Sequence, residues 1–262
     1  MQTNESALKD NHSSRQGVQV IERAALILRA LQKNPTGLSL GEIAKDIGLP
    51  RSTVQRIVDA LIKESFVIAS STGIGFRLGP ALIPLGSVTH FPIIEIVNPM
   101  LKTAAEETGE TVDLSVSNQE QMVFIDQIPT IHRLAATSAV GVSFPMHSAA
   151  NGKAALALMT DDELMRYRNH VSFHKRTDNT ITSWEQLTDQ LDIIRKTGIA
   201  FDREENSPGI SAVAIALRAP NNDIIAVSIP TPTARFEEKE ADIVAAISKL
   251  ADNLKGKLVS HT

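Results

Sequence analysis

The sequence predicts an α+β fold with two domains: an N-terminal winged helix-turn-helix and a larger C-terminal domain built around one central antiparallel or mixed sheet. Its 262 residues exceed the usual size of a single domain. Residues 17–78 have the pattern of three helices followed by two short strands, whereas residues 92–262 mix helices with strands. We therefore predict domains at 15–79 and 92–262, joined by a linker at 80–91.

The composition excludes several classes of protein. No segment approaches the roughly 18 consecutive apolar residues that a membrane-spanning helix needs. The N-terminus is polar and lacks the apolar core of a secretory signal, so we expect a cytoplasmic protein. Cysteine is absent, which excludes disulfide bonds, cysteine-ligated metals and thiol nucleophiles. We predict no cofactor and no metal site.

The charge is distributed unevenly along the chain. Residues 1–88 hold 10 Lys and Arg against 7 Asp and Glu, whereas residues 89–262 hold 16 against 23, which gives the overall net charge of −4. A basic N-terminal domain joined to an acidic C-terminal domain is expected when the first domain binds the phosphates of nucleic acid and the second does not. The asymmetry therefore indicates that the N-terminal domain is the one that meets nucleic acid.

Three helices are expected in the N-terminal domain. Residues 1–14 are polar and aperiodic, which predicts a disordered arm. Apolar residues at helical spacing predict a first helix over 17–32. Ser39 and Glu42 have the S-x-x-E spacing that caps the start of a second helix. Pro50 suits the first position of a third helix, because its fixed backbone angle and missing N–H cost nothing there.

The third helix has an apolar face and a polar face. Its apolar residues recur at helical spacing and are expected to point inward: Val54, Ile57, Val58, Leu61 and Ile62. The polar face carries Arg51, Ser52, Thr53, Gln55 and Arg56. Two short strands at 66–69 and 75–78, joined by a turn-rich tip, complete the wing.

The polar face suits a DNA groove. In a winged helix-turn-helix the third helix enters the major groove, where arginine can bind a guanine edge through two hydrogen bonds and glutamine an adenine edge. We expect Arg51, Gln55 and Arg56 to read base edges. Ser52, Thr53 and the wing residues Thr72 and Gly73 are expected to bind the backbone, and Ser39 is a further DNA-binding candidate.

The second domain is expected to start near Pro92. Helices are predicted at 93–107, 148–159, 161–170, 183–197 and 237–257. Strands are predicted at 111–117, 121–128, 133–140, 199–202, 210–218 and 223–229. Helices and strands in this order are typical of an α+β domain with one sheet.

Blocks of residues in both domains resemble the IclR-type transcription regulators. Residues 40–44 and 49–56 resemble the DNA-binding helices of that family, and residues 76–79 resemble its wing strand. Three further blocks lie in the second domain, at 106–112, 146–154 and 202–209, so the resemblance covers the chain from about Val18 to Leu254. It implies a ligand-responsive, sequence-specific DNA-binding repressor and/or activator with a GAF-like effector-binding domain.

The predicted effector site lies where a helix begins beside the sheet. Small residues at 148–152 start that helix, so the backbone N–H groups at Ala150 and Asn151 can hold a carboxylate. The resemblance places Asp202 toward the effector and implies a pocket completed by Ala212, Ser228 and Pro230. Two anions in one partly buried site repel unless one is protonated, so we expect Asp202 to accept a hydrogen bond from a ligand hydroxyl or to orient neighbouring backbone instead of meeting the carboxylate directly. Apolar strand residues are expected to cover the rest of the ligand: Ile210, Val213 and Val227. These residues predict that the effector is a small organic acid, either aromatic or short-chain.

Simpler interpretations of the same residues remain open. Ser148 or Asn151 can merely cap the helix, and Asp202 can lie in a solvated loop. His147 shows no metal-ligand spacing with the other histidines, which favours a structural or surface role.

Two other functions compete with a sensor. A hydrolase using Ser148 with His147 or His174 and Asp202 would need a base within reach of the serine, and no Gly-x-Ser-x-Gly elbow is present. We therefore predict no catalytic residues and no enzyme. The other alternative is a DNA-binding protein whose second domain only oligomerises, but such a domain has no need for small polar residues at a helix start beside an acidic loop.

Assembly follows from the size of one DNA-reading unit. A single winged helix covers few base pairs, so specificity requires two of them and a near-palindromic operator. The resemblance implies a homodimer joined through the first helix and the connector at 82–88, with pairing into a homotetramer as a further possibility.

Overall fold

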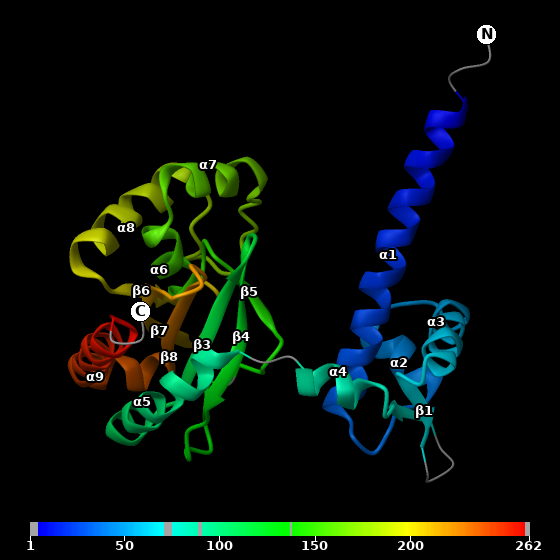
Figure 1. Ribbon diagram of the computed structural model, residues 1–262, viewed down its shortest axis with the longest axis horizontal. Coiled ribbons are helices and arrows are strands. Elements are labelled where there is room, and N and C mark those ends of the chain that lie inside the picture. The colour runs from blue at the N-terminus through cyan, green and yellow to red at the C-terminus, as the bar shows by residue number, and fades with distance from the viewer. Residues whose placement is uncertain (1–4, 71–74, 89–90, 137, 260–262) are drawn as a thin grey trace. The chain divides into compact units, whose positions relative to one another are not determined.

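Residues 5–70, 75–88, 91–136 and 138–259 are described by the computed structural model of the chain (Figure 1). The chain divides into two units, Met1–His90 and Phe91–Thr262, each with its own hydrophobic core. In the described residues, no helix is long and apolar enough to cross a membrane.

The N-terminal unit is the predicted winged helix-turn-helix. It contains the helices α1 (Glu5–Lys33), α2 (Leu40–Ile47) and α3 (Arg51–Lys63), the antiparallel strands β1 (Val67–Ala69) and β2 (Phe76–Leu78), and the helix α4 (Leu82–Val88). The wing is tied to the segment before α2, because Leu38 and Phe76 form an isolated antiparallel bridge.

The start of α2 has the predicted capping box. The Glu42 backbone N–H donates to the Ser39 hydroxyl over 3.3 Å, and the Ser39 backbone N–H donates to the Glu42 carboxylate over 2.8 Å. Gly48 ends α2 in the left-handed conformation, with φ of 67°, which glycine adopts without strain. Pro50 is the N-cap of α3, one position earlier than predicted, because the proline backbone is extended at ψ of 138°.

The core of this unit differs from the predicted inward residues of α3 at one position. Ile62 is 37% exposed, since the buried face of α3 is narrower than the apolar pattern suggested. The residues that are buried together come from all three helices and β1: Ile27, Leu31, Ile43, Val54, Ile57, Val58, Leu61 and Val67. Residues 5–14, for which the sequence predicts a disordered arm, continue α1 in the structure. That stretch contains no proline or glycine, and extending an existing helix costs much less than nucleating one.

The C-terminal unit is built on one antiparallel sheet with the strand order β5-β4-β3-β8-β7-β6. The strands are β3 (Val112–Asn118), β4 (Gln121–Ile128), β5 (Ser143–Pro145), β6 (Ala200–Arg203), β7 (Ile210–Arg218) and β8 (Ile224–Pro232). The helices are α5 (Pro92–Thr108), α6 (Ala150–Leu158), α7 (Asp161–His170), α8 (Trp184–Thr197) and α9 (Thr233–Val259).

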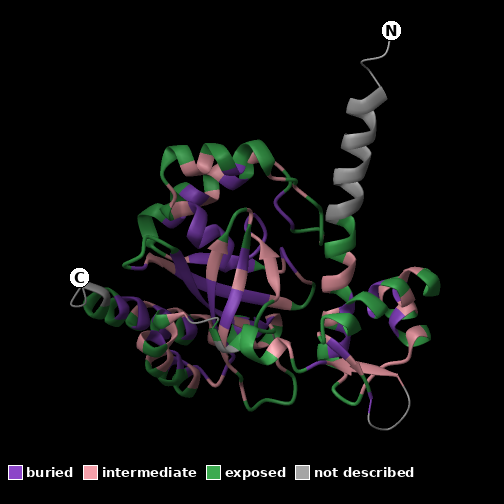
Figure 2. Ribbon diagram, turned by 45° about the vertical axis from the view of Figure 1, so that its right-hand side comes forward, coloured by how far each residue is buried: buried purple, intermediate pink, exposed green. Residues whose placement is uncertain are grey.

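Helices cover both faces of this sheet. Helices α5 and α9 pack on one face, and α6, with α7 and α8 outside it, covers the other, so the central strands are buried (Figures 1 and 2). Alternate residues of β7 therefore enter different cores: Val213 and Ile215 face α5 and α9, whereas Ala212 and Ala214 face α6. The small side chains on the α6 side leave room beneath that helix.

One predicted strand is wrong. The described residues of 133–140 are not a strand, and β4 is instead paired by β5 along Gln121 to Val123. Side chains hold the segment between β4 and β5. The Ser138 hydroxyl donates to the Asp113 carboxylate, and the Arg235 guanidinium donates to the carbonyl of Leu134 over 3.1 Å. These bonds replace the strand pairing that the alternating sequence pattern suggested.

Candidate functional site

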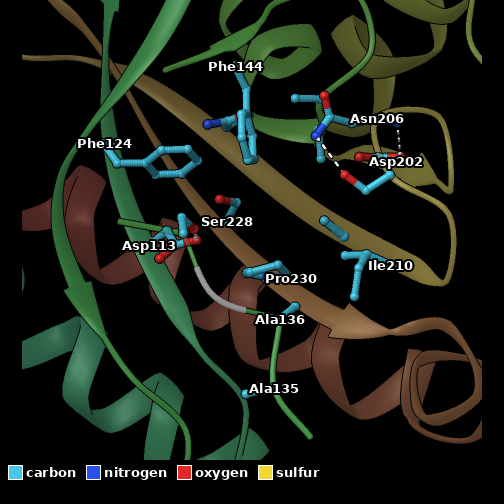
Figure 3. Close-up of a pocket in the computed structure, with 16 residues that line it drawn as sticks. Asp113, Phe124, Ala135, Ala136, Phe144, Asp202, Asn206, Ile210, Ser228 and Pro230 are labelled. Carbon is cyan, nitrogen blue, oxygen red and sulfur yellow. Dashed lines mark hydrogen bonds between the residues drawn. The ribbon is translucent and has the colours of Figure 1, made fainter. Parts of the chain in front are cut away.

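A cavity of about 300 Å³ lies between the sheet and the start of α6 (Figure 3). It is lined by the start of α6, by residues of all six strands of the sheet and by two loops that follow β4 and β6. All seven effector-binding candidates line it: Ala150, Asn151, Asp202, Ile210, Ala212, Ser228 and Pro230. Residues far apart in the sequence are thus brought to one cavity, although their role as ligand contacts stays a prediction.

Strand register explains why these residues meet. Asp202 of β6 lies opposite Ala212 of β7, which lies opposite Pro230 of β8. Ser228 of β8 is paired with Asp113 of β3. Because side chains at paired positions share a face of the sheet, and residues two apart on a strand share it too, two neighbouring rows of residues form the cavity floor.

Two apolar residues were placed wrongly by the sequence prediction. Val213 and Val227 are fully buried in the core on the opposite face of the sheet, against α5 and α9. A one-residue step along a strand reverses the face, so neither side chain can cover the ligand. The aromatic rings of Phe124 and Phe144 line the cavity in their place, with centroids 5.1 Å apart and an edge-to-face angle of 84°.

The sequence prediction also missed polar residues of the cavity. They come from β3 and from the two loops: Asp113, Ser138, Asn206 and Ser207. Asp113 carried a detectable signal, since a lone aspartate between Val112 and Leu114 in a strand is costly to bury without a reason. The loop residues carried no comparable signal, because nothing in their local pattern fixes where a loop lies.

The start of α6 faces the cavity without a side-chain cap. Its N-cap is Ala149, which has no side chain able to accept a hydrogen bond. Ser148, a predicted cap, donates instead to the Asn206 side-chain oxygen over 3.5 Å. The Asn151 amide donates to the Ser115 hydroxyl over 3.0 Å, and its oxygen accepts from the Gly152 backbone N–H over 2.9 Å, which leaves the N–H groups of Ala150 and Asn151 for a ligand. The first backbone N–H groups of α6, with the positive end of its dipole, therefore suit an anionic or acceptor group in the cavity.

Asp202 is buried, not solvated, and it organises the loop beside it. Only 5% of the residue is exposed, and one carboxylate oxygen accepts hydrogen bonds from the backbone N–H groups of Glu205 and Asn206, over 2.7 and 3.3 Å. Burial raises the pKa of Asp202 to about 7, and the neighbouring Glu205 carboxylate also raises it, against the opposing effect of these hydrogen bonds and of Lys153. Near neutral pH, Asp202 is therefore able to accept or to donate a hydrogen bond.

Asp113 is a second buried carboxyl group in the cavity. The side-chain amide of Gln127 donates to one of its oxygens over 2.7 Å, and the Ser138 hydroxyl donates to the other. Burial raises the pKa of Asp113 to about 6, although both hydrogen bonds lower it. The two carboxyl groups lie on opposite sides of the cavity, with Asp113 beside Phe124 and Ser228 and Asp202 beside Asn206 (Figure 3).

A buried ion pair supports the loop that carries Asn206. The Lys153 ammonium, on α6, donates to the Glu205 carboxylate over 2.5 Å and to the Gln190 side-chain oxygen over 2.6 Å. The Lys153 side chain is fully buried, and burial lowers its pKa, which the Glu205 charge opposes. Lys153 does not line the cavity, and neither Lys nor Arg occurs among the described lining residues.

The arrangement around Ser148 disfavours the hydrolase alternative. Its hydroxyl contacts Asn206, and in the described part of the chain neither ring nitrogen of His147 has a hydrogen-bond partner. The His147 ring instead packs against Phe173, with centroids 5.2 Å apart. Burial lowers the pKa of His147, and no base within hydrogen-bond distance activates the serine.

The predicted DNA-reading residues of α3 differ in their surroundings. Arg51 and Ser52 are exposed at the start of α3. Thr53 and Arg56 lie on the flank facing α1, where they line a groove with Val20. The Gln55 amide donates to the Asp59 carboxylate over 2.7 Å, which occupies one of its two N–H donors and leaves the other donor and the oxygen for a base edge.

The remaining DNA-binding candidates lie outside α3. The Ser39 hydroxyl accepts the capping hydrogen bond of α2, which leaves its own proton free to meet a phosphate. Thr72 and Gly73 lie outside the described residues. None of the DNA-binding assignments is tested by the structure, and all of them stay predictions.

Family models match both units of the chain. The model of the bacterial transcriptional regulator IclR C-terminal domain matches residues 85–255, and the model of the IclR helix-turn-helix domain matches residues 20–68. The chain belongs to the IclR family of transcription regulators. The resemblance found in the sequence is thereby confirmed, together with a DNA-binding regulator that has an effector-binding domain.

Individual IclR relatives agree with the family models. The chain is 40% identical over 231 residues to the HTH-type transcriptional regulator Rv1719 of Mycobacterium tuberculosis, covering 88% of this chain and 89% of that protein. Its fold is similar to the crystal structure of Thermotoga maritima IclR, with a TM-score of 0.71 and 29% identity over 94% of this chain and 99% of that one.

A more distant IclR homolog, from Microbacterium hydrocarbonoxydans, was crystallised as a complex with 4-hydroxybenzoate. It shares the fold, with a TM-score of 0.65 over 89% of this chain and 99% of that one. The sequence identity is 18%. This likeness therefore speaks for the fold and not for a common ligand.

Proposed function

We propose that this IclR-family regulator senses a small organic acid in the cavity beside α6 and changes its binding to operator DNA in response. The observation that carries the proposal is the cavity itself, about 300 Å³ in volume, which gathers all seven residues predicted for effector binding. A domain that only oligomerises has no need for such a cavity. Binding sites for small molecules are commonly of this size and combine apolar walls with few polar groups.

The polar groups suggest how an acid would lie. Its carboxyl group would meet the first backbone N–H groups of α6 at Ala150 and Asn151, beside Asp202. Its apolar body would pack on Phe124, Phe144 and Ile210. Because no cation lines the described part of the cavity, an ionised ligand and an ionised Asp202 would repel each other. A proton shared between the two carboxyl groups removes that repulsion.

The proposed contacts with operator DNA lie on α3 and the wing. Arg51, Gln55 and Arg56 read base edges, while Ser52, Thr53 and the wing contact the backbone. Two copies of the chain bind a near-palindromic operator as a homodimer or homotetramer. The protein is a cytoplasmic regulator and not an enzyme, so the effector leaves the cavity chemically unchanged.

A ligand screen on the full chain tests the effector site. Thermal stabilisation is measured across aromatic and short-chain carboxylic acids, for the wild type and for Asn151→Leu and Ser228→Leu, which place bulk in the cavity. The acids that stabilise the wild type are expected to lose at least tenfold in affinity for both variants, and to be recovered unchanged after incubation. Equal affinity for all three proteins places the effector site elsewhere, and conversion of the ligand reveals an enzyme.

A further inference from the structure

Asp113 is a buried carboxyl group whose hydrogen-bond partners do not explain why an acid occupies this position. It is 1% exposed, and the hydrogen bonds that the described residues donate to it come from the neutral groups of Gln127 and Ser138. Uncompensated burial of a carboxylate is costly. An asparagine would fit the same space and could accept the Gln127 bond, so these two partners do not explain why the side chain is an acid.

The Asp113 carboxylate keeps acceptor capacity toward the cavity. An ionised carboxylate offers about four acceptor positions, and the two hydrogen bonds occupy one on each oxygen. Asp113 lines the cavity, on the side opposite Asp202 (Figure 3). A ligand donor at this position would donate a charge-assisted hydrogen bond to the carboxylate, which is about twice as strong as a neutral one.

The surroundings of Asp113 specify where that donor must lie on the ligand. Phe124 and Phe144 flank the same side of the cavity and present apolar rings to the body of the ligand (Figure 3). Ser148, which lies just before α6, donates to the side-chain oxygen of Asn206, and Asn206 lies beside Asp202 (Figure 3). In the proposed function the acid group lies there, on the side of the cavity opposite Asp113. The ligand donor therefore belongs at the end of the molecule remote from its carboxyl group.

We infer that Asp113 accepts a hydrogen bond from a hydroxyl group at that remote end, and so selects hydroxylated acids over their unsubstituted parents. This inference rests on the proposed function, because it takes the acid group to lie at α6. A hydroxyl group suits the position, since a phenol or alcohol keeps its proton beside an aspartate at neutral pH. An unsubstituted acid would place an apolar group beside Asp113 and leave that carboxylate buried without a third hydrogen-bond partner. Its binding is therefore weaker than that of the hydroxylated acid.

Matched pairs of acids test the selection on the full chain. The probes are benzoate and 4-hydroxybenzoate, phenylacetate and 4-hydroxyphenylacetate, and propionate and 3-hydroxypropionate, with affinities measured by titration calorimetry at pH 8. In the best-binding pair, the hydroxylated acid is expected to bind the wild type about tenfold or more tightly than its parent. In Asp113→Asn this ratio falls below about threefold, because the charge that strengthens the bond is gone.

A matched control separates selection from damage to the fold. Asp126 lies on the neighbouring strand β4, does not line the cavity and accepts a hydrogen bond from Asn98, so Asp126→Asn makes the same chemical change outside the site. It should keep the wild-type ratio. A ratio near one in the wild type, or an unchanged ratio in Asp113→Asn, overturns the role of Asp113 while leaving the acid site intact. Binding of none of the six acids overturns the proposed acid site and this inference with it.

Discussion

Binding of an organic acid is predicted to take up a proton at Asp202. Burial holds the pKa of this carboxyl at about 7, so about half of the free protein carries the proton at pH 7 and about a tenth at pH 8. The charged groups around it are Lys153 and Glu205, which pair with each other, and Asp113 across the cavity. If the ligand carboxylate binds only when Asp202 is protonated, each complex formed at pH 8 consumes about 0.9 proton.

The magnitude follows from the same pKa. The dissociation constant should rise about fivefold between pH 7 and pH 8 and about tenfold between pH 8 and pH 9, because the competent protonated form becomes scarce. The Asp113 carboxyl, with a pKa raised to about 6, is already ionised over this range and contributes little. Titration calorimetry in buffers of different ionisation enthalpy measures the proton count directly, with benzoate and 4-hydroxybenzoate as ligands.

A variant provides the control for this pH dependence. Asp202→Asn keeps the oxygen that accepts the Glu205 and Asn206 backbone N–H groups but cannot ionise, so its dissociation constant should not change between pH 7 and pH 9. The reasoning is refuted if the wild type binds the acid with the same affinity at pH 7 and pH 9 and takes up no proton.

Three further predictions concern DNA reading and the support of the cavity. Replacing Arg56 with alanine should cost about 1–3 kcal/mol at the operator and relax base preference, as measured by anisotropy on matched and mutated duplexes. Gly152→Ala should lower the melting temperature, because the new Cβ would lie 2.3 Å from the Cα of Met146, and overpacking costs about 1–3 kcal/mol. Lys153→Met should destabilise the fold by about 3–5 kcal/mol in urea unfolding, since it leaves the Glu205 carboxylate buried and unpaired.

Each of these has a control elsewhere in the chain. Lys63→Ala removes a positive charge at the other end of α3, away from the predicted base-reading residues, and should keep the wild-type base preference, so an equal loss of preference would argue against Arg56 as a reader. Gly41→Ala should be neutral or stabilising, because its Cβ would meet only the Ser39 hydroxyl at 4.0 Å. Adding Glu205→Leu to the Lys153 variant should recover stability, and failure to do so contradicts the unpaired-charge explanation.

Local signals predicted most of the fold. The capping pair Ser39 and Glu42 fixed the start of α2, and helical spacing located α3 and α6, because these features depend on residues close together in the sequence. The prediction of a strand at 133–140 failed for the opposite reason. The alternating pattern fits a strand, but hydrogen bonds from Ser138 to Asp113 and from Arg235 to Leu134 hold the described residues of this segment in a loop. Those partners are distant in the sequence, so no local pattern reveals them.

The residues of the candidate site were predicted only in part, because strand register, which a local pattern does not fix, decides which side chains reach the cavity. Residues placed by resemblance to the family, such as Asp202 and Pro230, line the cavity. Of the three residues placed by apolar character alone, Ile210 lines it, whereas Val213 and Val227 face the other core. Strand register decides the face, and a single-residue error reverses it. The ion pair between Lys153 and Glu205 joins α6 to a loop about fifty residues later, so no local pattern could reveal it.

DNA binding with and without ligand tests the central claim most directly. The full chain is titrated into a duplex selected from a random pool, in the presence and absence of the acid that best stabilises the wild type. The ligand should change the wild-type affinity for DNA by about 5- to 150-fold, the usual range of coupling between two sites. Asn151→Leu and Ser228→Leu should bind DNA as the wild type does and lose this response. A full ligand response in both variants would contradict the account, because the cavity would then not be the sensor.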